Sequence, residues 1–343
     1  MNIEQLIRKN IACLKPYSCA RDEFKGRASV YLDANESPFN EPFNRYPDPM
    51  QSELKTLVAK LKNVRESQIM VGNGSDEPID LIYRIFCEPY SDNVVAFEPT
   101  YGMYQVAADI NAVEYRKVPL RPDFSLDADR LLAATDEHTK VIFLCSPNNP
   151  SGNLMRSSEI EKILRQFQGI TVIDEAYIDF ADAPSYLTQL DNYPRMIVLQ
   201  TFSKAWAMAS VRCGLAFAAE NIIAYFNKVK YPYNVNLLSQ HFVLERIKNH
   251  QEEKNEWVRK ILSERQPLAD ALRRLPIVET VYPSDANFLL VKVNDANRIY
   301  QSLVEQSIIT RNRNSVALCG NCLRITVGTA KENKTLLKAL KTI

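Results

Sequence analysis

Short apolar segments alternate with helical segments along the first two thirds of the chain, and this alternation limits the possible folds more than any other feature. Four short, mostly apolar runs end at turn residues, as buried strands of a parallel sheet do: they are 93–97, 140–145, 169–173 and 196–199. Helical patterns lie between these runs, at 78–87, 101–110 and 157–167. The alternation predicts an α/β fold in which helices cover both faces of a mostly parallel sheet.

The character of the sequence changes after residue 235. From about 236 to 275 glycine is absent and apolar residues recur at helical spacing, so we expect one or two long helices that cross to a second unit. Strand patterns and one helix then predict a smaller α+β domain. We predict three stretches: an N-terminal arm with part of the small domain (1–38), a large domain (39–235) and a small C-terminal domain (236–343). Four prolines indicate that 36–50 is a long ordered loop.

Charge is balanced, with 42 Lys and Arg against 41 Asp and Glu and a formal net charge of +1. This balance gives no electrostatic basis for binding nucleic acid or a membrane, so basic residues are expected to act locally on small anions. The N-terminus lacks the apolar core of a signal peptide, and no apolar run reaches the roughly 18 residues of a membrane span. The odd count of seven cysteines indicates a reducing compartment, and we expect a cytoplasmic protein. Cys319 and Cys322 are at most half a zinc site, so we predict no metal.

The most informative loop follows the run at 196–199. It contains Ser203, Lys204 and, eight residues further on, Arg212. Lysine is usually a solvated surface residue, but the apolar neighbours of Lys204 argue against that here. Near a cation or in a poorly solvated site its pKa falls, which favours a Schiff base. Ser203 and Arg212 are candidate phosphate ligands, and an aldehyde combined with a phosphate suggests pyridoxal phosphate (PLP) as the cofactor.

Other loops carry polar groups where an open α/β sheet binds its ligands. Ser75 and Asp76 open a helix whose free N–H groups can hold a phosphate, although an ordinary capped helix also explains them. Tyr101 can stack on a flat ring or pack in the core. Asn149 lies in a tight Asn-Pro-Ser-Gly turn, and its amide can point into a cleft.

Asp174 directly follows the apolar run at 169–173, where an ionised carboxylate is costly unless it has a partner. A pyridinium N–H would be such a partner, and the carboxylate would keep the ring able to accept electrons. The alternative is that Asp174 caps a turn. Tyr177 lies three residues further on and could reach the phenolic oxygen of the ring.

Two arginines in the last third are candidates for binding an anionic substrate. Arg324 lies inside an apolar strand pattern and Arg311 lies near a short apolar segment. An arginine within an apolar strand needs an anionic partner. That partner is either a buried carboxylate of the protein or a carboxylate or phosphate of the substrate.

The candidate residues resemble, in order and spacing, the fold-type I PLP-dependent aminotransferases over nearly the whole chain. The resemblance is carried by Asn149-Pro150-Ser151-Gly152, Asp174-x-x-Tyr177, Ser203-Lys204 with Arg212, and Arg324. More narrowly, the chain resembles the histidinol-phosphate aminotransferase branch at 15–21, 32–36, 45–48, 74–77, 174–180 and 322–329. The resemblance implies a large domain with a mostly parallel seven-stranded sheet flanked by helices, and a smaller α+β domain.

The resemblance also implies a role for each candidate. Lys204 would hold the cofactor as an imine and move protons, and Asp174 would pair with the pyridinium nitrogen. Asn149 and Tyr177 would bind the ring oxygen, and Tyr101 would stack on the ring. The implied phosphate ligands are Ser75, Asp76, Thr201, Ser203, Arg212 and, from the partner subunit, Tyr46. The implied substrate-binding residues are Arg324, Arg311, Tyr17, Arg21 and Asn35.

The activity that the resemblance implies is transfer of the amino group of L-histidinol phosphate to 2-oxoglutarate, in histidine biosynthesis. It implies a homodimer with shared sites and small anionic substrates, without nucleic-acid or membrane partners. A related reaction stays open, that of an aromatic aminotransferase or a threonine-phosphate decarboxylase. A PLP-binding regulatory or storage protein without turnover is a further alternative, although no DNA-binding domain accompanies the site.

Overall fold

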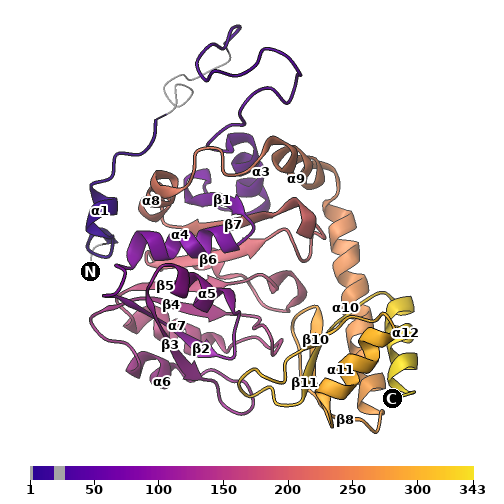
Figure 1. The fold of residues 1–343 in the computed structure, drawn as a ribbon. Helices are drawn as coiled ribbons and strands as arrows, with labels where there is room; N and C mark the ends of the chain where they lie inside the picture. The colour runs from indigo at the N-terminus through magenta and orange to yellow at the C-terminus, as the bar shows by residue number, and fades with distance from the viewer. Residues whose placement is uncertain (1–2, 19–27) are drawn as a thin grey trace.

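Two β-sheets of different size form the molecule, and long helices join them (Figure 1). The computed structural model describes residues 3–18 and 28–343. The large sheet has seven strands and the small sheet has four. The predicted α/β fold with a mostly parallel seven-stranded sheet, flanked by helices and accompanied by a smaller α+β unit, is confirmed.

The strands of the large sheet follow the order β1-β7-β6-β5-β4-β2-β3. Their bounds are β1 Ile69–Asn73, β2 Asn93–Glu98, β3 Glu114–Pro119, β4 Thr139–Cys145, β5 Ile170–Asp174, β6 Met196–Thr201 and β7 Cys213–Ala218. Neighbouring strands are parallel except at β7, which runs antiparallel to both β6 and β1. Because the direction reverses twice across β7, β1 ends at the same edge of the sheet as the parallel strands.

The four apolar runs of the sequence correspond to β2, β4, β5 and β6, so these predictions are confirmed. The patterns did not predict β1, β3 and β7. β3 lies at the edge of the sheet and buries only one of its six residues, so it carries no apolar run. β7 is buried throughout but consists largely of small residues, which give a weak strand signal.

Helices connect the strands and cover the large sheet. Their bounds are α1 Lys9–Ala12, α3 Ser52–Lys62, α4 Asp76–Phe86, α5 Met103–Ile110, α6 Ala128–Ala133, α7 Ser157–Gln166 and α8 Glu220–Val229. The three predicted helical patterns correspond to α4, α5 and α7 and are confirmed. The N-terminal segment also packs on this unit, because Ile3, Leu6, Ile7 and Ile11 belong to its core.

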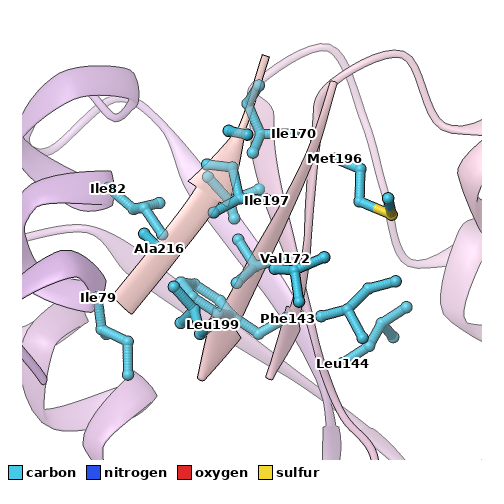
Figure 2. Close-up of a cluster of buried hydrophobic side chains, with 14 of the residues drawn as sticks. Ile79, Ile82, Phe143, Leu144, Ile170, Val172, Met196, Ile197, Leu199 and Ala216 are labelled. Atoms are coloured by element: carbon cyan, nitrogen blue, oxygen red, sulfur yellow. The ribbon is translucent and has the colours of Figure 1, made fainter. Parts of the chain in front are cut away.

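The core of the large unit lies between the central strands and the helices. Figure 2 shows Ile79 and Ile82 of α4 facing the strands that carry Ile197, Leu199 and Ala216. All five side chains are fully buried. This apolar layer holds the strand ends, and therefore the loops that follow them, in fixed positions.

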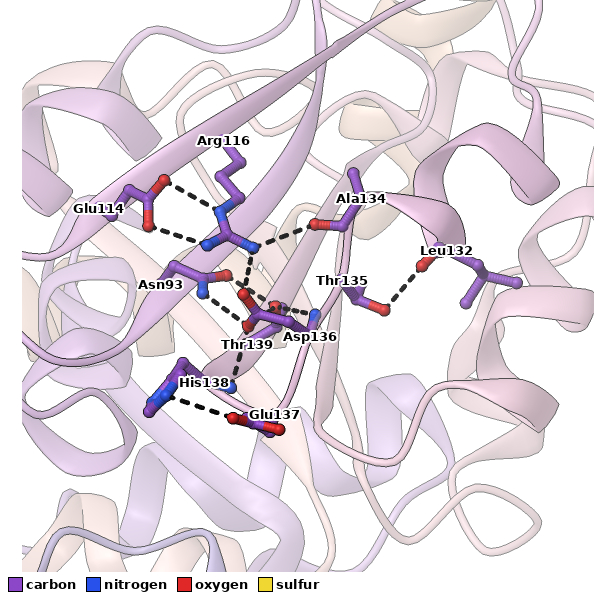
Figure 3. Close-up of polar contacts among 10 residues, drawn as sticks. All are labelled: Asn93, Glu114, Arg116, Leu132, Ala134, Thr135, Asp136, Glu137, His138 and Thr139. Carbon is purple, nitrogen blue, oxygen red and sulfur yellow. Dashed lines mark hydrogen bonds and ion pairs between the residues drawn. The ribbon is translucent and has the colours of Figure 1, made fainter.

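A polar network joins β2, β3 and β4 at their amino ends (Figure 3). Arg116 donates hydrogen bonds to Glu114 (3.0 Å) and Asp136 (2.7 Å). Asn93 donates to Asp136 (2.9 Å) and accepts from Thr139 (2.7 Å). Donation from Asn93 and Arg116 lowers the pKa of Asp136 below its ordinary value. The network fixes the register of these strands at the end opposite to the loops after β2 and β4.

The small unit is built on an antiparallel sheet in the order β10-β11-β9-β8. Its strands are β8 Val278–Val281, β9 Phe288–Val293, β10 Arg311–Asn312 and β11 Cys322–Thr326, and its helices are α11 Ala296–Glu305 and α12 Ala330–Leu340. Of the one or two long helices predicted here, the structure has two, α9 Leu237–Asn249 and α10 Gln251–Arg273. Side chains of α9 belong to the large core, whereas Leu268 and Leu272 of α10 belong to the small one. The change from one core to the other therefore occurs along α10.

The segment 36–50 contains no helix or strand, which confirms the predicted loop. In Figure 1 the described part of the chain between α1 and α3 runs outside the compact body. None of the helices within residues 3–18 and 28–343 combines the length and apolar character that a membrane span requires.

Leu199→Ala tests how far the central core stabilises the fold. Leu199 is fully buried in β6, so the substitution is expected to lower the free energy of unfolding by about 2–5 kcal/mol, measured by urea denaturation. Ile110→Ala, at a side chain that is 70% exposed, is the control and should change it by less than about 0.5 kcal/mol. Equal effects of the two substitutions would contradict this account of the core.

Candidate active site

Loops from several strands meet at one edge of the large sheet, because β1, β2, β4, β5 and β6 all end there. The register sets Asp174, the last residue of β5, beside Cys145 of β4 and Leu199 of β6. β7 begins at this edge, which brings Arg212 to the same place. An open α/β sheet binds its ligands at the carboxyl ends of its strands.

A cavity of about 90 Å³ opens at this edge. It is lined by ten of the eleven residues predicted for catalysis and cofactor binding: Ser75, Asp76, Tyr101, Asn149, Asp174, Tyr177, Thr201, Ser203, Lys204 and Arg212. The structure therefore brings together residues that are up to 137 positions apart in the sequence (75 to 212). The individual roles predicted for these side chains stay predictions.

Lys204 lies in the loop between β6 and β7, with its amine in the cavity. Burial lowers the pKa of Lys204 below its ordinary value of 10.5, and the positive charge of Arg324 lowers it further. Its Nζ atom lies 5.5 Å from the centroid of the Tyr177 ring. A lysine in this environment is more readily neutral than a surface lysine and can act as a nucleophile or base.

Two glycines allow the start of β7 to approach the backbone just after β1 closely beside the cavity. A Cβ atom on Gly214 would meet the Gly74 carbonyl carbon, and one on Gly74 would lie 2.5 Å from Arg212 Nη2. Gly74 also has a positive φ of 69°, a conformation that favours glycine. This close approach brings the start of α4 near Arg212.

The start of α4 and the Ser203 loop together form an anion-binding region. Ser75 makes no side-chain capping hydrogen bond, so the first N–H groups of α4 are available to a ligand. The hydroxyl of Ser203 is buried without a hydrogen-bond partner. Arg212 donates to Asp76 at 3.2 Å, which fixes its guanidinium beside these groups.

Asp174 is a buried residue of the cavity lining, and burial raises its pKa above the ordinary value of 3.8. One carboxylate oxygen accepts a hydrogen bond from the Tyr104 hydroxyl at 2.6 Å. The other accepts from the backbone N–H of Ala176 at 3.1 Å. Asp174 therefore does cap a local turn, but it also faces the cavity, and the two interpretations of this residue are compatible.

Sequence reasoning missed Tyr104. Its ring is fully buried and stacks on Phe143, with ring centroids 4.7 Å apart. Tyr101, three residues earlier, packs edge-on against it and donates its own hydroxyl to Asp76 at 2.9 Å. The signal in the sequence was a second tyrosine one helical turn after Tyr101, but its target, Asp174, lies 70 residues away.

A second cavity, of about 690 Å³, adjoins the first and shares Tyr101, Asn149, Tyr177 and Lys204 with it. The small unit contributes Arg311 of β10, Arg313 just after β10 and Arg324 of β11 to its lining. Arg324 donates to Asn149 Oδ1 at 2.5 Å, a contact between the two units. None of the three arginines forms an ion pair with a carboxylate of residues 3–18 or 28–343. The alternative that Arg324 pairs with a buried carboxylate of the protein therefore finds no support in these residues. Arg313 is the second residue that sequence reasoning missed.

Three predicted residues do not line either cavity within one chain. Tyr17 is largely exposed, and Asn35 and Tyr46 border a separate depression of about 220 Å³ on the arm. The Tyr46 ring stacks on Tyr233, with centroids 4.4 Å apart. The role of Tyr46 in a partner subunit stays a prediction, as do those of Tyr17 and Asn35. Arg21 lies outside the described residues.

Comparison with known proteins identifies the relatives of this arrangement. Residues 29–340 match the family described as aminotransferase class I and II. The chain is 58% identical over 340 residues to the histidinol-phosphate aminotransferase of Bacteroides thetaiotaomicron, covering 99% of this chain and 98% of that protein.

Two solved structures confirm the fold. The chain is similar to the histidinol-phosphate aminotransferase from Clostridium acetobutylicum (TM-score 0.81, 23% identity, 88% of this chain and 90% of that one). It is also similar to the histidinol-phosphate aminotransferase from Sinorhizobium meliloti in complex with pyridoxal-5'-phosphate (TM-score 0.80, 23% identity, 87% and 82%).

Asp174→Asn tests the electrostatic state of the buried carboxylate. A raised carboxyl pKa means that the folded protein binds more protons than the unfolded chain between pH 3.8 and the folded pKa, so stability falls as pH rises through that window. We expect the variant without cofactor to melt at a higher temperature than wild type at pH 7, with the difference shrinking towards pH 4. The Tyr104 hydroxyl can accept a hydrogen bond from the new amide, so the substitution preserves that contact.

Asp182→Asn, at an exposed carboxylate, is the matched control and should show no such pH-dependent difference from wild type. An Asp174→Asn variant that is no more stable than wild type at pH 7 would contradict the inferred cost of burying this charge.

Proposed function

The chain belongs to the aminotransferase class I and II family, and we propose that it transfers the amino group of L-histidinol phosphate to 2-oxoglutarate with PLP as its cofactor. The products are imidazole acetol phosphate and L-glutamate, and the reaction is a step of histidine biosynthesis. One observation carries the proposal: a cavity that combines a buried lysine, a buried carboxylate and an anion-binding region opens onto three arginines. The name of the 58% identical relative supports the choice of substrate.

The anion-binding region fits the phosphate of PLP. Three kinds of hydrogen-bond donor can bind one small anion here. They are the unpartnered hydroxyl of Ser203, the free N–H groups at the start of α4 and the guanidinium of Arg212. Thr201 accepts a hydrogen bond from the Ser203 backbone at 3.1 Å and holds this loop in position.

Other residues of the cavity lining fit the ring of PLP. A carboxylate whose pKa is raised by burial gains most from a cationic N–H partner, and Asp174 is such a group. The Tyr104 hydroxyl and the Ala176 N–H hold its two oxygens, so its orientation is set before any ligand binds. Asn149 and Tyr177 line the same space and are suited to bind the ring oxygen.

When bound, PLP supplies an aldehyde that reacts with amines and a ring that accepts the electron pair left by the substrate Cα–H bond. Lys204 Nζ accepts the proton from the substrate α-carbon and returns a proton in the second half of the reaction. Its lowered pKa favours the neutral amine that can do this. Asp174 Oδ atoms hold the negative charge that stabilises a protonated ring nitrogen.

Arg324 and Arg311 bind the anionic end of the substrate. They are register partners on β11 and β10, so their side chains leave neighbouring strands side by side. The Asn149 side chain orients Arg324 through the 2.5 Å hydrogen bond. A guanidinium accepts phosphate or carboxylate, which allows histidinol phosphate and 2-oxoglutarate to use one pocket.

The same proposal includes a cytoplasmic homodimer with shared sites. The arm exposes large apolar side chains, among them Leu32 (92%), Phe39 (78%) and Phe43 (59%). Large exposed apolar side chains on an arm that extends from the compact body are suited to bind a second copy of the chain. Six cysteines of the described residues are free thiols, which supports a reducing compartment. We also retain the boundaries 1–38, 39–235 and 236–343 as proposed, with the N-terminal helix packed on the large unit.

Two related reactions remain alternatives, and each gives a different product. Release of carbon dioxide from O-phosphothreonine would favour a decarboxylase, and faster turnover of phenylalanine than of histidinol phosphate would favour an aromatic aminotransferase. A protein that binds PLP but never exchanges it with amino donors would favour a regulatory or storage role.

Lys204→Ala tests the proposed reaction. Wild-type protein with PLP is expected to form glutamate from histidinol phosphate and 2-oxoglutarate, and the variant is expected to lose at least about 10²–10⁴-fold in kcat while it stays folded. Lys334→Ala, at an exposed lysine of α12, is the control and should keep full activity. Substantial turnover by Lys204→Ala would exclude the role of this lysine, and an inactive wild type would exclude the substrate.

Mixing Lys204→Ala subunits with Tyr46→Ala subunits tests the shared site. If Tyr46 acts in the partner subunit, a dimer of one Lys204→Ala subunit and one Tyr46→Ala subunit contains one complete site. We expect the mixture to regain activity well above the sum of the two separate variants, and to sediment at about twice the 39.2 kDa of the chain. Activity that merely averages the two variants would mean that each subunit completes its own site.

A further inference from the structure

Three arginines of the small unit line the larger cavity. Arg311 and Arg324 are directly opposite each other on neighbouring strands. Arg313 follows Arg311 by two residues, which is the spacing that returns a side chain to the same face of an extended chain. All three line one cavity together with Lys204.

This arrangement is unfavourable without a ligand, because like charges opposite each other on adjacent strands repel. Within residues 3–18 and 28–343 no carboxylate pairs with any of the three arginines. A carboxylate nearby in the same cavity, Glu98, already pairs with Lys117 at 3.3 Å. The positive charge is therefore left for an anion that comes from outside the chain.

Arg313 is the least satisfied of the three. Arg324 has the oxygen of Asn149 as an acceptor, whereas Nε of Arg313 is buried without any acceptor. Burial lowers the pKa of Arg313 to about 10, and the charges of Arg324 and Arg311 contribute. Cys319 does not supply the missing counter-charge, because burial raises the pKa of its thiol to about 12 and the thiol is neutral at neutral pH.

We propose that Arg313 is a further substrate-binding residue that, together with Arg311 and Arg324, selects a phosphate monoester dianion over a carboxylate. The inference rests on the proposed function for the identity of the substrate. A phosphate presents three acceptor oxygens and up to two negative charges, so it can bind three guanidinium groups. A carboxylate presents two oxygens and one charge, and two arginines already satisfy it.

The first test measures binding of inorganic phosphate to the holoenzyme by calorimetry. PLP then fills its own phosphate site, so added phosphate reports on the arginine cluster. We expect Arg313→Gln to weaken phosphate binding on the order of tenfold or more, and Arg313→Lys to weaken it less, because lysine keeps the charge but not the two-pronged geometry. Arg165→Gln removes the same charge from an exposed surface pair with Glu161 and should leave the affinity unchanged.

An Arg313→Gln holoenzyme that binds phosphate as tightly as wild type would overturn the proposal. This result does not depend on the assay of turnover. A wild-type enzyme that bound phosphate through Arg313 but did not use histidinol phosphate would contradict the proposed function and leave the anion site in place.

The second test separates the two substrates kinetically. In Arg313→Gln we expect the KM for histidinol phosphate to rise on the order of tenfold with kcat little changed, and the KM for 2-oxoglutarate to change by much less. Equal increases for both substrates would mean that Arg313 provides general positive charge and does not discriminate between them.

Melting temperatures in phosphate-free buffer check that the variant acts through ligand binding. Arg313 has no acceptor within the described part of the fold and suffers repulsion from two neighbours, so Arg313→Gln is expected to melt no lower than wild type. A clear drop in melting temperature would indicate a structural partner for Arg313 and would overturn its assignment to the substrate.

Discussion

Asp174 ends the central strand of the large sheet in an almost fully buried position, and the geometry of the site depends on holding a carboxylate there. Burial alone would favour its neutral form. The hydroxyl of Tyr104 and the backbone of Ala176 oppose this by donating to its two oxygens. The two donors are in place because β5 ends beside β4 and the ring of Tyr104 packs on Phe143. Packing of the apolar core therefore positions the hydrogen bonds to the carboxylate. A strand end that shifted would lose both donors at once.

The two units contribute different charged residues to the lining of the cavities. The large sheet holds the lysine and the carboxylate, whereas the small sheet supplies cations without partners of its own among the described residues. The hydrogen bond from Arg324 to Asn149 links the two sets across the cavity. Lys204 is affected by both units, because burial in the large unit and the positive charge of Arg324 in the small unit each lower its pKa. The state of the reactive amine therefore depends on the position of the small unit.

Sequence reasoning predicted the parts of this arrangement that leave a local signal. Apolar runs gave the buried strands, and the polar residues directly after them gave most of the cavity lining, because parallel strands bring their ends to one edge. Edge strand β3 has no such run, and β7 consists largely of small residues, which give a weak strand signal. The sequence pattern around Tyr104 does not reveal its contact with Asp174, which is made 70 residues away. The sequence around Arg313 does not distinguish it from a surface arginine, because its position beside Arg311 and Arg324 in one cavity is known only from the structure.

The predicted role of Tyr46, on the arm, depends on a contact between two subunits. Tyr46 stacks on Tyr233 within its own chain and lies away from the cavity that contains Lys204, so its predicted role requires a second subunit. Neither the spacing of residues in one sequence nor the geometry of one chain can test a contact of that kind. The exposed apolar side chains of the arm indicate only that this surface is suited to a partner.

The passage of α10 from one core to the other has an evolutionary consequence. If the arginines of β10 and β11 bind the substrate as proposed, substitutions there alter which anion is recognised, while the loops that carry Lys204 and Asp174 are anchored in a separate core. Substitutions in the small unit that contact neither Asn149 nor Lys204 can therefore accumulate with nearly additive effects, whereas Arg324 is coupled to the large unit through its hydrogen bond with Asn149. A lineage with this fold can diversify through its small sheet while the chemistry at the large sheet stays the same.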